Sequence, residues 1–112
     1  MQDRLKYRAY NKVKKCYFYW DLRMGFDGTF EVWGPPEQCT GLKDKNGKLI
    51  YEGDIYTYTT YKGVSLFVVR YAASQTGYYG YKVGGDGGTR QDIMSFNEVI
   101  GNIHENPELL DA

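Results

Sequence analysis

The fold of this chain is set by the stretch CTGLKDKNGKLIYEGDIY, residues 39–56. Residues 44–47 read Asp-Lys-Asn-Gly, and the Asn-Gly pair adopts positive φ angles at little cost, which is typical of a tight hairpin turn. A second turn at residues 51–54 opens a strand that begins near Ile55. The short apolar runs beside these turns indicate β-strands.

Strand signals recur along the chain at the spacing that is typical of barrels and sandwiches. The expected strands cover residues 4–10, 16–22, 30–33, 55–61, 65–72, 78–83 and 98–103. Residues 37–42 are expected to be extended, and residues 49–51 fit either a short strand or a turn. Residues 92–96 fit either a strand or a short helical turn, and residues 106–110 fit a terminal helical turn capped by Asn106. We therefore expect one mainly β domain, residues 1–112, folded as a small barrel or sandwich.

The most apolar run, residues 65–72, is expected to be the central buried strand. The predicted core contains Leu66, Val68, Ile55, Ile100 and Ile103. Tyrosine and glycine, with 12 and 14 copies, suit half-buried strands and turns respectively, which agrees with a β-rich chain.

Charge is unevenly distributed in a chain whose formal net charge is zero. Residues 1–50 carry ten Lys/Arg against six Asp/Glu, a net +4, and residues 51–112 carry four against eight, a net −4. The basic N-terminal half can attract phosphate groups or an acidic protein. It can equally pair with the acidic half of the same chain, so both interpretations stay open.

The cysteine and hydropathy patterns indicate an intracellular protein that binds neither metal nor membrane. Cys16 and Cys39 are isolated from each other, which predicts reduced structural thiols, and His104 is too distant for a zinc motif. The first residues resemble no signal peptide, and no apolar run approaches the ~18 residues of a membrane span. We expect no cofactor.

No combination of residues forms a convincing catalytic set, so a non-enzymatic protein is expected. His104, the only histidine, is predicted to lie on the surface in a polar turn. The carboxylates Asp44, Glu52 and Asp54 are explained by turn capping. Residues 84–88, Gly-Gly-Asp-Gly-Gly, lack the Gly-Lys-Ser/Thr ending of a phosphate loop and predict a hairpin tip.

Aromatic residues give the strongest signal for a binding surface. Residues 17–20 are all aromatic, and since neighbours in a strand point to opposite faces while only one face is core, some rings are expected to be exposed or to contact another chain. The equal alternative is that the rings cover and border a thin β-core. In the first strand, alternation places three bases and a tyrosine on one side. The predicted partner-binding residues are Arg4, Lys6, Arg8, Tyr10 and Trp20, with Tyr78, Tyr79 and Tyr81 as a second group.

Three blocks resemble the YopX family of small phage proteins. They are residues 5–12, residues 40–55 and residues 99–109. Tyr10 and Asn11 stand where the family pattern has Trp and Asp, and His104 replaces a residue that is usually aromatic. The resemblance implies a phage-encoded protein in the cytoplasm of the infected bacterial host, with an SH3-like barrel, and it implies no activity.

Two functions fit these observations. The first is a non-enzymatic binding module that engages or inhibits a host or defence protein, or another phage protein. The second is a phage accessory protein that binds nucleic acid or a nucleotide through the basic, aromatic N-terminal strands. The neutral net charge counts against the second function, because nucleic-acid-binding domains are usually basic. Self-association into a homo-oligomer is left open.

Overall fold

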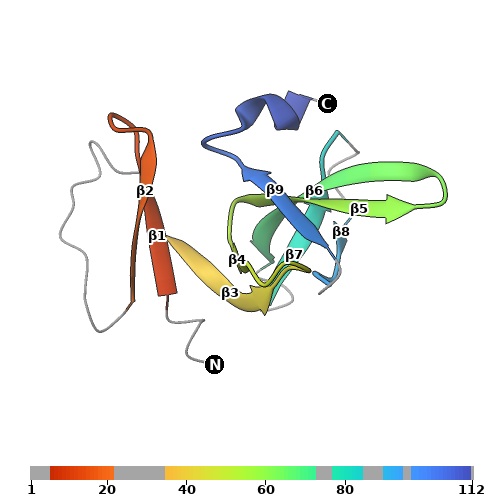
Figure 1. The fold of residues 1–112 in the computed structure, drawn as a ribbon, viewed down its shortest axis with the longest axis horizontal. Helices are drawn as coiled ribbons and strands as arrows, with labels where there is room; N and C mark the ends of the chain where they lie inside the picture. The colour runs from red at the N-terminus through yellow and green to blue at the C-terminus, as the bar shows by residue number, and fades with distance from the viewer. Residues whose placement is uncertain (1–5, 22–34, 73–76, 85–89, 95–96, 112) are drawn as a thin grey trace.

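Antiparallel strands form two sheets in the computed structural model, which describes residues 6–21, 35–72, 77–84, 90–94 and 97–111 (Figure 1). The four-stranded sheet has the order β2-β1-β3-β4, and the five-stranded sheet has the order β8-β7-β6-β5-β9. The strands are β1 (Lys6–Asn11), β2 (Cys16–Asp21), β3 (Glu37–Lys43), β4 (Leu49–Tyr51), β5 (Asp54–Thr60), β6 (Gly63–Ala72), β7 (Gly77–Lys82), β8 (Arg90–Gln91) and β9 (Glu98–Asn102).

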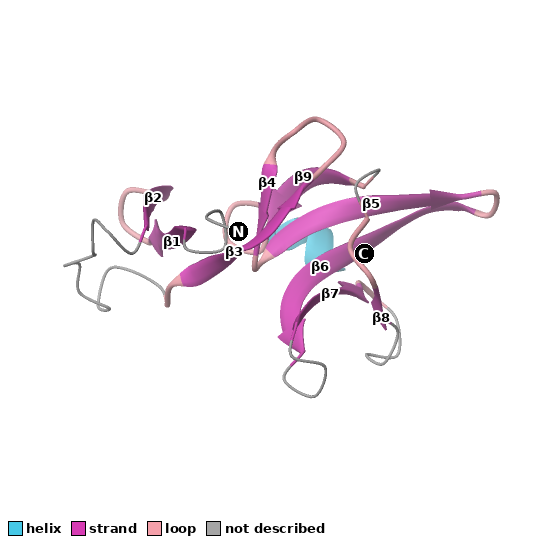
Figure 2. Cartoon of the chain, turned by 90° about the horizontal axis from the view of Figure 1, so that it is seen from below, coloured by secondary structure: helices cyan, strands magenta, loops and turns pink. Residues whose placement is uncertain are grey.

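The mainly β fold predicted from the sequence is confirmed. The expected terminal helical turn is the 3-10 helix η3, Pro107–Asp111. Residues 92–94, for which a strand or a helical turn was expected, are neither, and the predicted strand at residues 30–33 lies outside the described residues. The five-stranded sheet curls into a half-barrel, with its edges at β8 and β9 (Figure 2).

The core lies against the half-barrel, whose middle strand is β6. Tyr56, Phe67 and Val69 from β5 and β6 pack with Ile50 from β4 and Val99 from β9. The rings of Tyr56 and Phe67 stack with their centroids 5.7 Å apart. β6 is therefore the central buried strand, as its apolar run predicted.

The predicted core is partly right. Ile55 and Val68 are buried, Leu66 and Ile103 are half-buried, and Ile100 is exposed, so the prediction is wrong for Ile100. A β-bulge explains this exposure, because Ile55 pairs with Gly101 and the next residue of β5 pairs with Val99. Ile100 is thus the extra residue of the bulge, without a partner across the ladder.

The turn between β3 and β4 forms as its sequence predicted and also joins the two sheets. Gly47 has a φ of 81°. The Asp44 carboxylate accepts hydrogen bonds from the amides of Asn46 and Lys48 at 2.9 Å, and its other oxygen accepts one from the amide of Val99 at 3.0 Å. Asp44 therefore caps the turn and holds β9 beside it.

Replacing Asp44 with asparagine is expected to lower the free energy of unfolding by about 1.5–3 kcal/mol at pH 7. Burial acts to raise the pKa of Asp44, but the three backbone hydrogen bonds outweigh it and lower the pKa below its usual 3.8. The carboxylate therefore stabilises the fold fully above pH ~4 and loses this effect as the pH falls further.

Urea unfolding at pH 7 and at pH 3 would check this expectation. The difference in the free energy of unfolding between the wild type and Asp44→Asn should be smaller at pH 3 than at pH 7. The control Glu108→Gln, at an exposed position, should have the same free energy of unfolding as the wild type at pH 7. An equal difference at both pH values would show that the charge of Asp44 is not what stabilises the turn.

Candidate functional site

A buried arginine connects the two sheets. The Arg8 guanidinium, from β1, donates through Nε to Glu37 Oε1 and through Nη2 to Asp54 Oδ1, both at 2.8 Å. Nη2 also lies 3.2 Å from the carbonyl oxygen of Glu52. Arg8 is only 2% exposed. One guanidinium thus joins the N-terminal hairpin to β3 and to the first residue of β5.

Two tyrosine rings enclose this guanidinium. The Arg8 Cζ atom lies 4.2 Å from the ring centroid of Tyr17 and 4.8 Å from that of Tyr51. Burial acts to lower the pKa of Arg8, but the charges of Asp54 and Glu37 outweigh it and raise the pKa. Burial is also the main cause of the raised pKa of Tyr17. We call these five side chains the Arg8 junction.

The loop after β9 closes the Arg8 junction on one side. The His104 ring stacks on Tyr10 with centroids 4.7 Å apart and 7° between the planes. His104 Nε2 lies 3.2 Å from Glu37 Oε2, and the hydroxyl of Tyr17 donates to Asn102 Oδ1 at 3.3 Å. His104 is half-buried here rather than on an open surface turn as the sequence predicted.

The prediction that rings and bases on β1 and β2 form an exposed surface is wrong for two of the residues. Arg8 is buried in the Arg8 junction, and Trp20 is buried between Tyr7 and Phe18, with ring centroids 5.9 and 6.1 Å away. From the alternation in its sequence, one face of β1 was expected to be exposed to solvent, but Arg8 and Ala9, which lie on opposite faces, are both buried.

The other predicted partner-binding residues are spread over both sheets. Lys6 and Tyr10 are half-buried on β1, and Arg4 lies outside the described residues. The second group, Tyr78, Tyr79 and Tyr81, is half-buried on β7 of the half-barrel. The Tyr78 hydroxyl donates to Gln38 Oε1 of β3 at 2.7 Å. The two groups therefore lie on different sheets, which this hydrogen bond connects.

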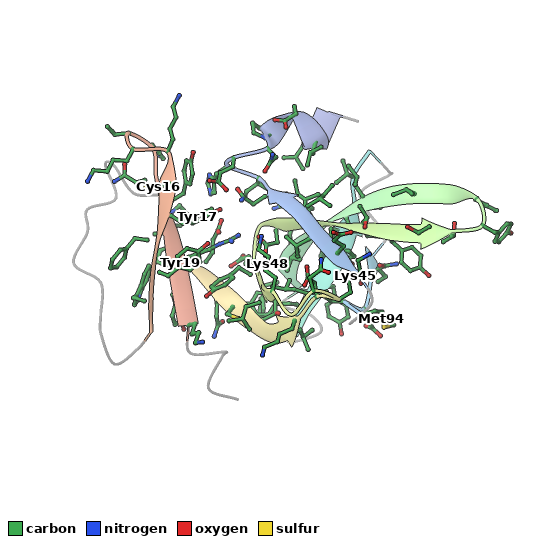
Figure 3. All side chains as sticks on the ribbon, viewed as in Figure 1. Cys16, Tyr17, Tyr19, Lys45, Lys48 and Met94 are labelled. Atoms are coloured by element: carbon green, nitrogen blue, oxygen red, sulfur yellow. The ribbon has the colours of Figure 1, made fainter. Side chains whose placement is uncertain are left out.

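The rings that the structure exposes are neighbours of the predicted ones. On β2, Phe18 is 43% and Tyr19, labelled in Figure 3, is 51% exposed. Because they are neighbours in a strand, their side chains lie on opposite faces. Val13 in the preceding turn is also exposed. Exposed lysines surround it at positions 12, 14 and 15. The expectation that some of the consecutive rings are exposed is confirmed, and we call these six residues the hairpin surface.

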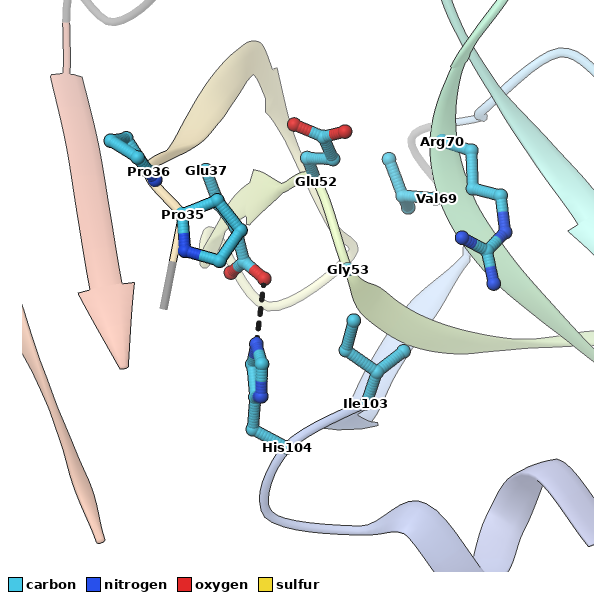
Figure 4. Close-up of a pocket in the computed structure, with 9 residues that line it drawn as sticks. All are labelled: Pro35, Pro36, Glu37, Glu52, Gly53, Val69, Arg70, Ile103 and His104. Atoms are coloured by element: carbon cyan, nitrogen blue, oxygen red, sulfur yellow. Dashed lines mark hydrogen bonds and ion pairs between the residues drawn. The ribbon is translucent and has the colours of Figure 1, made fainter. Parts of the chain in front are cut away.

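A small pocket lies beside the Arg8 junction (Figure 4). Its walls include Glu37, His104, Glu52 and Arg70, and its volume is about 210 Å³. Burial, together with the charge of Glu37, raises the pKa of Glu52. The volume is below the roughly 300–1,000 Å³ that is usual for small-molecule sites.

The predicted turn carboxylates do not converge. Asp44 binds the β3–β4 turn, whereas Asp54 binds Arg8 and the amide of Tyr51, at 2.8 Å each. Within the described ranges, no group of three or more His, Cys, Asp or Glu side chains could hold a metal ion.

Of the 84–88 loop only Gly84 is described. No helix in the described part of the chain is long and apolar enough to cross a membrane.

This protein is therefore a mainly β protein in which a half-barrel is joined to a second, four-stranded sheet. Comparison with known proteins identifies its family. The family described as YopX protein matches residues 30–111, so the chain belongs to the YopX family. The chain is also similar to the crystal structure of protein EF1440 from Enterococcus faecalis, with a TM-score of 0.58 and 27% identity, over 94% of this chain and 96% of that chain. A comparison with curated proteins gives no match.

Proposed function

We propose that this chain is a phage-encoded, non-enzymatic binding module that engages or inhibits a host or defence protein through the hairpin surface. The observation that carries the proposal is that β2, at the end of the four-stranded sheet, exposes an aromatic ring on each face, Phe18 on one and Tyr19 on the other. Aromatic side chains are enriched in protein interfaces and at their energetic hot spots. The site of action is then the cytoplasm of the infected bacterial host.

Charge indicates the kind of partner surface. Three exposed lysines, at positions 12, 14 and 15, lie in the turn between β1 and β2, next to the exposed Val13. Because the chain as a whole is neutral, this basic tip is a local feature. Such a tip favours a partner with an acidic patch beside an apolar one, and it accelerates the encounter at low salt.

The Arg8 junction supports this function by fixing the hairpin in place. Arg8, Tyr10 and Tyr17 share one face of the hairpin with Tyr19. They are held there by contacts with Glu37, Asp54, Asn102 and His104. A surface that is held in one arrangement before binding loses less conformational entropy when the partner arrives.

Nucleic-acid or nucleotide binding is the second candidate, and the same surface favours it. Exposed rings can stack on bases, and lysines can follow a phosphate backbone. Among the bases and rings of the N-terminal strands that were expected to serve this role, Arg8 and Tyr10 face the Arg8 junction and His104. The alternative therefore depends on the lysine tip together with Phe18 and Tyr19.

A pull-down from host lysate, with and without nuclease, would separate the two functions. We expect a specific protein band that survives nuclease and that weakens about 30-fold with the double variant Phe18→Ala/Tyr19→Ala, the effect of losing a hot spot of about 2 kcal/mol. Tyr71→Ala on β6 is a control of similar exposure.

Each outcome of the pull-down has a distinct meaning. Equal capture by the double variant, with its melting temperature unchanged, would place the binding surface elsewhere. Recovery of nucleic acid alone, lost on nuclease treatment, would favour the second function.

A further inference from the structure

The tip of the β3–β4 turn places an asparagine directly before a glycine, at Asn46 and Gly47. Asparagine is one of the chemically labile residue types of proteins. Both residues are exposed, and apart from its chain neighbours nothing lies within 4 Å of a Cβ atom placed on Gly47. Because glycine carries no side chain, its backbone nitrogen can approach the side-chain amide carbon of the preceding asparagine without hindrance.

The other asparagines of the chain lack this combination. Asn11, Asn97 and Asn102 are buried, with 5%, 1% and 7% of their surface exposed, and none of them precedes a glycine. Asn106 precedes a proline, which has no backbone N–H and so supplies no attacking nitrogen. Asn46 is thus the one asparagine of this chain that is both exposed and followed by glycine.

We propose that Asn46 is a site of spontaneous deamidation, a covalent modification that gives aspartate or isoaspartate at this position. The Gly47 amide loses its proton to a base in the solvent, and its nitrogen forms a bond to Cγ of Asn46. The bond from Cγ to Nδ2 then breaks, and ammonia leaves with a proton taken from water. Water opens the resulting cyclic imide at either carbonyl, which gives aspartate or, where the main chain continues through Cγ, isoaspartate.

Three hydrogen bonds hold the turn in an unreactive arrangement. The N–H of Gly47 donates to the carbonyl of Asp44 at 3.0 Å, and the N–H of Asn46 donates to the Asp44 carboxylate at 2.9 Å. The Asn46 side chain donates through Nδ2 to Glu98 Oε2 at 3.3 Å. The Gly47 nitrogen must leave its carbonyl partner before it attacks, so the reaction proceeds from a locally opened turn. The rate of deamidation therefore reports how often the turn opens.

The product changes the contacts between the turn and β9. A carboxylate at position 46 replaces the Nδ2 donor, so it meets Glu98 as a like charge. It also competes for Lys45, whose Nζ lies 3.4 Å from Glu98 Oε1. Isoaspartate in addition lengthens the main chain of a turn in which Gly47 has a φ of 81°. The modification therefore loosens the turn from β9, and it involves none of the residues of the hairpin surface.

Peptide mass spectrometry would test this inference on the whole chain, kept folded in a mildly alkaline buffer and sampled over time. We expect the amide of Asn46 to become a carboxyl group before any other asparagine changes. Glu98→Ala should raise the rate about threefold, the effect of losing one weak hydrogen bond that holds the turn closed. The control Glu108→Ala, at an exposed position, should leave the rate unchanged. Gly47→Ala should lower the rate about fivefold, because the added methyl group hinders the attacking nitrogen.

Three results would overturn the inference. The first is no conversion at Asn46 in the folded chain over a period in which the same chain, unfolded in guanidinium chloride, is converted there. The second is earlier conversion at another asparagine. The third is a Glu98→Ala protein that is converted no faster than Glu108→Ala. None of them affects the proposed function, since partner capture is measured on variants of Phe18 and Tyr19.

Discussion

Replacing Arg8 with alanine is expected to destabilise the protein by about 3–5 kcal/mol. The substitution leaves the carboxylates of Glu37 and Asp54 buried without the guanidinium that now bonds to both at 2.8 Å. It also removes the cation between the rings of Tyr17 and Tyr51. Guanidinium chloride unfolding, followed by circular dichroism, would measure the loss.

Two further variants define what Arg8 supplies. Lys12→Ala removes an exposed base from the adjoining turn and should change the free energy of unfolding by less than about 0.5 kcal/mol. Arg8→Lys should recover only part of the lost free energy of unfolding, since an ammonium group lacks the planar guanidinium geometry that lets Arg8 bond to two carboxylates at once. An Arg8→Ala protein as stable as the wild type would mean that the carboxylates reach water in solution.

Gly53→Val is expected to cost about 2–5 kcal/mol, combining a strained backbone with a crowded core. Gly53 has a φ of 89°, which a β-branched residue tolerates poorly. A Cβ atom at this position would lie 2.8 Å from Glu37 Oε2, inside the Arg8 junction. Urea unfolding of the variant and the wild type would give the difference.

A valine substitution at Gly47 separates backbone strain from crowding. Gly47 has a similar φ of 81°, but nothing lies within 4 Å of a Cβ atom placed there. Gly47→Val should therefore cost only the backbone part, about 1–2 kcal/mol. Lys45→Ala, which removes an exposed ion pair to Glu98, should cost less than about 1 kcal/mol. Equal losses for the two glycine variants would show that contact with Glu37 contributes nothing.

Local features of the fold could be predicted because their causes lie within a few residues. The turn needs a positive φ, which Gly47 itself adopts, and a capping carboxylate, which Asp44 provides close by in the sequence. The central position of β6 follows from its apolar run. The exposure of Ile100 was missed, because a bulge depends on the register between β5 and β9, which the sequence of β9 alone does not reveal.

The candidate site was harder to predict because its contacts are distant in the sequence. Arg8 is 29 residues from Glu37 and 46 residues from Asp54, so nothing near Arg8 marks it as an internal cation. Because Arg8 alternates with other bases along the first strand, it was expected to lie on the solvent-exposed face of that strand. The aromatic run did predict exposed rings, but Trp20 is covered by its stacking neighbours while Tyr19 is open.

The Arg8 junction also determines how far the protein can be shortened. The YopX match begins at residue 30, after β1 and β2, so a chain cut to that boundary would lack Arg8. Glu37 and Asp54 would then lose the guanidinium that bonds to both of their carboxylates. The N-terminal hairpin thus supplies the internal counter-ion of the fold, although the family boundary separates it from β3, beside which β1 lies in the same sheet.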